Sequence, residues 1–223
     1  MRCAEDSGTL SSVPGGNLGR VRIVCDADGY GLTVVVLSGE LFDAIEVNAA
    51  RTGNHKRAAV RMSMLAAQAA PNGMSRAEAH MRAGEQWLLA EEPAEAAQEF
   101  RVALEHGGPT FADPRVQLAR ALFGLGDATG ARALIDELNE TAKSDPRTCD
   151  MVAELLIEQS DLRGALDWAT AGVAACMRAG DRDELPLLLR LRYRIRVDLG
   201  LGEDEYDKLL DTRPQVTQRP FGL

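Results

Sequence analysis

The side chains that most often carry out chemistry are few in this sequence, and they are widely separated. No two of the cysteines form a C-x-x-C pair, and the histidines His55, His80 and His106 lie 25 and 26 residues apart. Zinc sites and disulfide frameworks need closer and more regular spacing. We therefore expect no disulfide, no bound metal and no cofactor, and we expect four reduced thiols at Cys3, Cys25, Cys149 and Cys176.

Motifs for nucleophilic or phosphate chemistry are also missing from the sequence. It contains no G-x-S-x-G, no P-loop and no H-E-x-x-H. The stretch Gly15–Gly19 is rich in glycine, but no buried strand precedes it and no helix follows closely, so the pattern does not favour a phosphate loop. The many carboxylates are typical of a solvated surface. The sequence thus predicts a protein that is not an enzyme.

Charge is unevenly distributed along the chain. Residues 1–73 hold seven basic and seven acidic side chains, so the net charge of −9 comes from residues 74–223. An acidic domain is a poor binder of nucleic acid and of anionic membranes, because phosphate contacts need a basic face. The sequence has no signal-peptide core and no run of about eighteen apolar residues. We expect a cytoplasmic location and a protein partner.

An internal repeat dominates residues 77–177. Three stretches, 77–108, 112–143 and 146–177, superpose at five anchor positions with successive spacings of 35 and 34 residues. The anchors are Gly84, Ala119 and Ala153; Trp87, Leu122 and Leu156; Ala96, Ala131 and Ala165; Phe100, Ile135 and Ala169; and Ala103, Leu138 and Gly172. Small residues suit the points where two helices cross, and large apolar residues fill the holes between helices. Each unit is therefore predicted to be a pair of antiparallel helices that buries its apolar face against its neighbours.

Capping residues agree with this division. Helix starts are predicted at the capping box Ser75–Glu78, at Asp113-Pro114 and Asp145-Pro146, and at Asp127 and Asp161; helix ends are predicted at Gly107-Gly108 and Gly180. A fourth, degenerate unit follows. We expect a helix over residues 185–199, with Leu187, Leu188, Leu191, Ile195 and Leu199 on one face, and a short helix from Glu203 to Leu210.

The pattern resembles the tetratricopeptide repeat over roughly residues 75–210. Gly84, Trp87, Ala96, Phe100 and Ala103 occupy five signature positions in the first unit; the third unit is weaker, with Ala169 and Gly172 where the family prefers a large aromatic residue and alanine. The resemblance implies an all-α solenoid of antiparallel helix hairpins, with a right-handed superhelical twist. It also implies a concave groove lined by the first helix of each hairpin, where such proteins hold a segment of a partner.

When the groove positions of the tetratricopeptide repeat are aligned with the three units of this sequence, they define a candidate partner-binding groove on three helices. Its residues are Met81, Glu85, Leu88, Leu89, Val116, Arg120, Phe123, Asp150, Glu154, Ile157 and Glu158. The family's Lys and Asn clamp for a terminal carboxylate is absent, since those positions hold Met81, Glu85, Val116 and Arg120. An apolar strip with acidic neighbours favours a basic or amphipathic partner segment. The alternative is that the apolar members are partly buried and only hold the stack together.

The arginine-rich helix over residues 185–199 allows a second functional hypothesis. Arg190 and Arg194 fall on one side of its apolar face, and Arg192 and Arg196 fall on the other. These arginines either pair with nearby Asp and Glu residues or form a site for an anion or nucleic acid. The segment from Leu188 to Asp207 also resembles the repeat part of bacterial SEC-C-motif proteins. Their Cys-rich zinc-binding tail is missing, because no cysteine follows Cys176.

The first 73 residues show no repeat. Residues 21–25 and 32–37 could pair as a β-hairpin, and residues 58–70 have a helical composition whose apolar face is mostly alanine. We expect a largely disordered extension over residues 1–73, a helical repeat domain over 74–212 and a flexible tail over 213–223. Because Met74 directly precedes the capping box, two readings stay open: translation starting at Met74, or an extension with a separate role.

Overall fold

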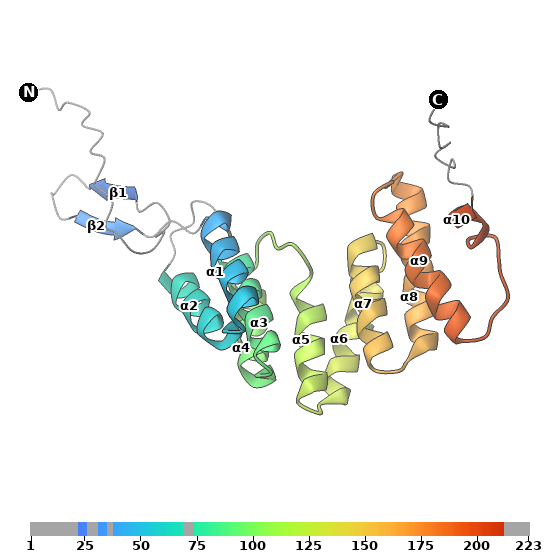
Figure 1. Ribbon diagram of the computed structural model, residues 1–223, viewed down its shortest axis with the longest axis horizontal. Helices are drawn as coiled ribbons and strands as arrows, with labels where there is room; N and C mark the ends of the chain where they lie inside the picture. Colours follow the sequence, from blue (N-terminus) through green and yellow to red (C-terminus); the bar gives the residue numbers. More distant parts are fainter. Residues whose placement is uncertain (1–21, 26–30, 35–37, 69–73, 212–223) are drawn as a thin grey trace, which may run out of the picture.

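A computed structural model describes residues 22–25, 31–34, 38–68 and 74–211 of the chain. Helical hairpins follow one another in sequence order and lie side by side, as Figure 1 shows. The elements are β1 (Arg22–Cys25), β2 (Gly31–Val34), α1 (Gly39–Thr52), α2 (His55–Gln68), α3 (Arg76–Leu89), α4 (Pro93–His106), α5 (Pro114–Gly124), α6 (Ala128–Thr141), α7 (Pro146–Glu158), α8 (Leu162–Ala179), α9 (Leu185–Asp198) and α10 (Lys208–Asp211).

The predicted helix starts are confirmed. The side-chain oxygens of Ser75, Asp113, Asp127, Asp145 and Asp161 each accept a hydrogen bond from a backbone N–H in the first turn of α3, α5, α6, α7 and α8, respectively. These bonds satisfy N–H groups that have no partner within the helix. The predicted helix ends are confirmed as well, because Gly107 and Gly180 follow α4 and α8, both at positive φ.

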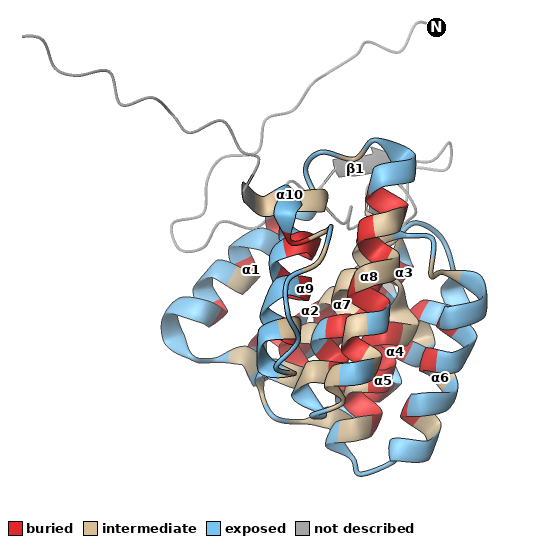
Figure 2. Ribbon diagram, turned by 90° about the vertical axis from the view of Figure 1, so that its right-hand side faces the viewer, coloured by how far each residue is buried: buried red, intermediate tan, exposed pale blue. Residues whose placement is uncertain are grey.

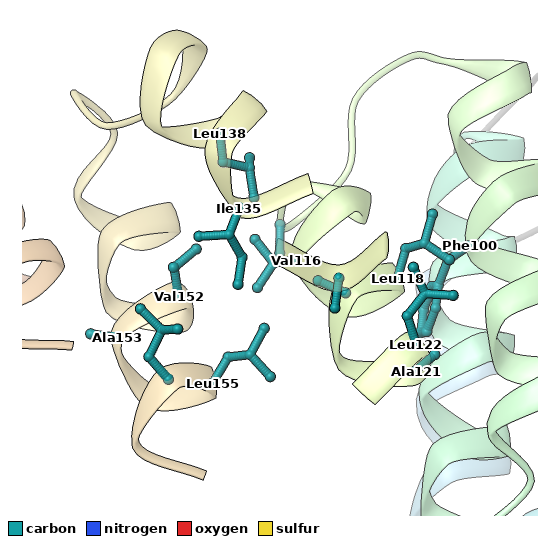
Figure 3. Close-up of a cluster of buried hydrophobic side chains, with 14 of the residues drawn as sticks. Phe100, Val116, Leu118, Ala121, Leu122, Ile135, Leu138, Val152, Ala153 and Leu155 are labelled. Carbon is teal, nitrogen blue, oxygen red and sulfur yellow. The ribbon is translucent and has the colours of Figure 1, made fainter. Parts of the chain in front are cut away.

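The repeat anchors form the core of the array. Ala96, Ala131 and Ala165 are fully buried, and a Cβ added to Gly84 would overlap the ring of Phe100. Figure 2 shows the buried positions facing the interior of the stack. In Figure 3, Val116, Ile135 and Val152 from α5, α6 and α7 point toward one another, so the core is continuous from one hairpin to the next.

Residues 38–68 differ from the expected extension. They form α1 and α2, and α2 packs along α3. A separate apolar cluster joins Leu41, Phe42 and Ile45 of α1 and Met62 of α2 to small residues of α3. The Arg82 guanidinium of α3 binds Asp43 and Glu46 of α1 at 2.6 and 2.5 Å. The expectation of a largely disordered segment is therefore wrong here, because these residues bury apolar surface against the first repeat.

The predicted β-hairpin is present, and the C-terminal end differs from the prediction in two details. Strands β1 and β2 pair antiparallel, with Arg22 opposite Val34 and Cys25 opposite Gly31. At the other end, α10 covers only Lys208–Asp211, and Leu187 is exposed on α9 although it was predicted to lie on the apolar face. The glycine-rich stretch Gly15–Gly19 and the predicted flexible tail over residues 213–223 lie outside the described residues, and a translation start at Met74 stays a prediction.

Candidate functional site

The first helices of the hairpins form one continuous surface. Helix α3 contacts α5, α5 contacts α7, and α7 contacts α9. We call the outward sides of α3, α5 and α7 the first-helix face. Met81 and Val116, two of the predicted groove residues, are 2% and 0% exposed. Their assignment as partner contacts is wrong, because their side chains point into the core between neighbouring helices and support the face from below.

Apolar side chains on this face are partly exposed. Leu88, Phe123 and Ile157 are half-buried and pack against the main core cluster, whereas Leu89 is 59% exposed. The three half-buried residues therefore hold the stack together and also leave apolar surface in contact with solvent. Asp150 is half-buried next to this strip, and Glu154 and Glu158 are exposed.

A row of polar contacts crosses three helices. The Gln117 amide donates a weak hydrogen bond to Glu85 at 3.5 Å and accepts one from Arg120 at 3.3 Å. Arg120 Nε lies 3.2 Å from a Glu158 carboxylate oxygen, in an ion pair without hydrogen-bond alignment. The structure thus brings Glu85, Arg120 and Glu158 into one row. Sequence reasoning missed Gln117, a buried glutamine that only a three-dimensional arrangement identifies.

Glu85 lies in a small pocket rich in carboxylates. The pocket has a volume of about 250 Å³, and Glu46, Glu78 and Glu85 line it together with Met81 and Arg82. Burial, together with the charges of Glu46 and Glu78, raises the pKa of Glu85 to about 7, against the opposing charges of Arg82 and Arg120. This carboxylate therefore has too little positive charge around it in the isolated chain.

Asp150 repeats this situation on α7. Burial, together with the charges of Glu154 and Glu184, raises its pKa to about 6, and the charge of Arg194 on α9 opposes this rise. The first-helix face therefore carries a half-buried carboxylate on its first helix and another on its third, Glu85 on α3 and Asp150 on α7.

An exposed aromatic residue stands beside the Glu85 pocket. Phe111, in the loop between α4 and α5, is 70% exposed and contributes to the pocket lining. Its backbone N–H donates to Glu78 at 2.8 Å, and the guanidinium of Arg147 lies 4.1 Å from its ring centroid. This loop therefore ties α3 to α7 along one edge of the array.

The arginine-rich helix is partly neutralised by the residues that follow it. Arg192, which is 4% exposed, and Arg196 both bind Asp204 and Asp207; the Arg192 Nη1 to Asp207 distance is 3.1 Å, and that from Arg196 Nε is 2.9 Å. The Arg192 guanidinium also lies over the ring of Tyr206. These contacts favour the pairing interpretation over an anion-binding helix, because two of its four cations are already used to fasten the C-terminal end.

Reactive side chains are scarce in the described part of the chain. Cys149 and Cys176 are buried as free thiols, and burial raises the pKa of each, Cys149 to about 12, which makes them poor nucleophiles. Within residues 22–25, 31–34, 38–68 and 74–211, no group of three or more His, Cys, Asp or Glu side chains could hold a metal ion. In that same part, none of the helices is long and apolar enough to span a bilayer.

One family model agrees with the helical repeat. Residues 88–155 match the family model described as "Tetratricopeptide repeat". Among solved structures, a chain of the APC/C hetero-tetramer Cut9-Hcn1 is 14% identical over 72% of this chain and 32% of its own length, with a TM-score of 0.46. YrrB, "a TPR protein with an unusual peptide-binding site", is 17% identical over 70% of this chain and 85% of its own length, with a TM-score of 0.40.

The chain spans about a third of the Cut9-Hcn1 chain that it matches, and no curated protein matches the sequence. The resemblance of residues 188–207 to SEC-C-motif proteins finds no support in these matches and stays a prediction. The repeat anchors, the stacked hairpins and the family match over residues 88–155 together identify the fold as an all-α, tetratricopeptide-like solenoid.

Proposed function

We propose that this chain is a protein–protein interaction scaffold that holds a basic or amphipathic segment of a partner on the first-helix face, without catalysing a reaction. The observation that carries the proposal is the pair of half-buried carboxylates, Glu85 and Asp150, which flank an apolar strip and lack enough nearby positive charge. A Lys or Arg side chain from a partner would supply the missing charge, and apolar side chains would cover Leu88 and Phe123.

The pattern on the face suggests how such a segment would lie. Helices α3 and α7 each present apolar side chains beside carboxylates, whereas α5 presents Phe123 beside Arg120. An amphipathic segment crossing the three helices would therefore meet apolar surface on each helix and carboxylates on α3 and α7. Arg120 in the middle is already paired with Glu158, which leaves the uncompensated negative charge at Glu85 and Asp150. Partner cations are therefore expected at two places, one near α3 and one near α7.

Phe123 is the most informative residue to test. Tagged full-length chain, wild type and Phe123→Ala, would be used to capture partners, which would be identified by mass spectrometry and remeasured as purified proteins. Removing a central aromatic contact should weaken binding by about 2 kcal/mol, or roughly 30-fold. The matched control is Leu125→Ala, because Leu125 is also half-exposed at the end of α5 but lies about 200° away around the helix.

Thermal unfolding of the same variants separates binding from stability. Phe123 packs against the core, so some loss of stability is expected in addition to the loss of binding. If Phe123→Ala lowered the unfolding midpoint strongly and left partner affinity equal to that of Leu125→Ala, Phe123 would be a core residue and the proposal for this face would fail.

A further inference from the structure

A second cleft opens at the N-terminal end of the array, between α1 and α2. The two helices leave the short turn at Gly53 and Asn54 and diverge, as Figure 1 shows, and the space between them has a volume of about 500 Å³. This cleft shares no lining residue with the Glu85 pocket. It therefore forms a separate surface, on a part of the chain whose sequence did not indicate a site.

The two walls of the cleft differ in chemistry. The α1 wall is apolar: Leu41 and Ile45 are nearly buried at its base, and Ala44 is exposed above them. The α2 wall carries Arg57 and Arg61, both exposed. Because residues four apart lie on the same side of a helix, both guanidinium groups line the cleft. A ligand in this space would meet hydrocarbon on one side and positive charge on the other.

These two arginines are not neutralised by the protein itself. Within the described part of the chain, neither Arg57 nor Arg61 forms a hydrogen bond or an ion pair. Of the three carboxylates of α1, Asp43 and Glu46 both bind Arg82 on α3, and Glu40 does not line the cleft. In a chain with a net charge of −9, two adjacent unpaired cations beside an apolar wall are a local exception.

Further hydrogen-bond donors lie where the helices meet. The amides of Asn48 and Asn54 line the cleft near the turn. The Asn48 side-chain oxygen accepts a hydrogen bond from Arg51 at 3.2 Å, which leaves its N–H₂ group as a donor. The polar part of the lining therefore consists mainly of donors, which is the complement of a carboxylate.

The spacing along the walls indicates the shape of the ligand. Leu41 and Ala49 are eight residues apart on α1, or about 12 Å, which is the length of roughly four residues of extended peptide. Arg57 and Arg61 are separated by about 6 Å along α2. In an extended chain, side chains two residues apart point the same way at a separation of about 6.6 Å, and the residues between them point the opposite way.

We infer that this cleft binds an extended partner segment in which acidic and apolar residues alternate. Its carboxylates would pair with Arg57 and Arg61, and its apolar side chains would lie against Leu41 and Ile45. Nucleic acid fits less well, because the apolar wall cannot form favourable contacts with a phosphate backbone and the net negative charge of the protein repels it. The inference does not depend on the function proposed for the first-helix face, which favours segments of the opposite charge.

The test uses labelled octapeptides with capped ends and the full-length chain, measured by fluorescence anisotropy. The probes are an alternating Leu/Glu peptide, a peptide of the same composition with Leu and Glu in two blocks, and an alternating Leu/Lys peptide. We expect the alternating Leu/Glu peptide to bind about 10-fold more tightly than the block peptide, since only the former presents both faces together.

Variants assign the binding to the cleft. Arg57→Glu/Arg61→Glu should weaken binding of the alternating Leu/Glu peptide by about 10-fold or more and strengthen binding of the Leu/Lys peptide. Reversing the charge of the α2 wall should reverse the charge preference of the cleft. The matched control is Arg101→Glu/Arg132→Glu, which changes two exposed arginines on α4 and α6. Ala44→Trp, at an exposed position, should block the cleft without loss of helicity. Equal binding by the two charge-reversed variants, or no binding of the alternating Leu/Glu peptide to wild type at millimolar concentration, would overturn the inference.

Discussion

Replacing Glu85 with glutamine should make the protein more stable at neutral and alkaline pH while changing little at acidic pH. The folded chain raises the pKa of Glu85 from its ordinary value of 4.5 to about 7, mainly by burial. The native state therefore holds more protons than the unfolded state between these values, and the free energy of unfolding falls as pH rises through that window. Glutamine has the same shape, can still accept from Gln117 and has no proton to lose.

The size of the effect follows from the two pKa values. A difference of one pH unit corresponds to about 1.36 kcal/mol, so the interval from 4.5 to about 7 corresponds to about 3 kcal/mol. Glu85 keeps partial exposure to solvent, so the measured gain for Glu85→Gln above pH 7 should lie roughly between 1 and 3 kcal/mol. Below about pH 4.5 the side chain is neutral in both states, and the two proteins should unfold with similar free energies.

Urea unfolding at several pH values from about 5 to about 8 measures this directly. Urea is preferable to guanidinium because it does not screen charges, and Trp87 and Trp168 report unfolding by fluorescence. The control is Glu105→Gln, which removes an exposed carboxylate from α4 and should leave the pH profile nearly unchanged. If Glu85→Gln shifted the free energy of unfolding by the same amount at pH 5 and at pH 8, the Glu85 carboxylate would have enough positive charge around it. The charge argument for the first-helix face would then be refuted.

Three further changes test the packing. Ala131→Glu places a charge at a fully buried helix crossing and should cost about 3 kcal/mol or more, read from the unfolding midpoint. Asp207→Asn leaves Arg192 and Arg196 short of one negative charge in a mostly buried cluster, which should cost about 3 kcal/mol in urea unfolding. Removing residues 1–73 uncovers the side of α3 that packs on α1 and α2, so the midpoint should fall while circular dichroism remains largely helical.

The repeat was predictable because a local steric requirement determines the size of the side chain at each anchor position. Residue 131 must be small because helices cross there, and residue 122 must be large because it fills a hole between helices. Both requirements are independent of the rest of the sequence. Capping is local in the same sense, since Asp145 and Thr148 are only three residues apart. Rules of this kind can be read from spacing alone, and the hairpins they define are present in the structure.

The candidate site was less predictable because burial depends on neighbouring units. Met81 and Val116 occupy groove positions in the register, but contacts with the adjacent helices bury them completely. Gln117 gives no sequence signal, and its role emerges only because Glu85 and Arg120 come from different hairpins. The pairing of Arg192 with Asp207 was one of several options in the sequence, and the geometry selects it.

Helix α1 was missed for a different reason, and it connects the two proposed surfaces. Its apolar residues Leu41, Phe42 and Ile45 do not fit the repeat template, so pattern matching gave no reason to place it in the array. On one side, α1 supplies Glu46, which raises the pKa of Glu85 at the head of the first-helix face. On the other side it forms the apolar wall of the cleft. A partner that moved α1 would therefore change the charge balance at Glu85 as well as the shape of the cleft, so binding at one surface would alter affinity at the other through this helix.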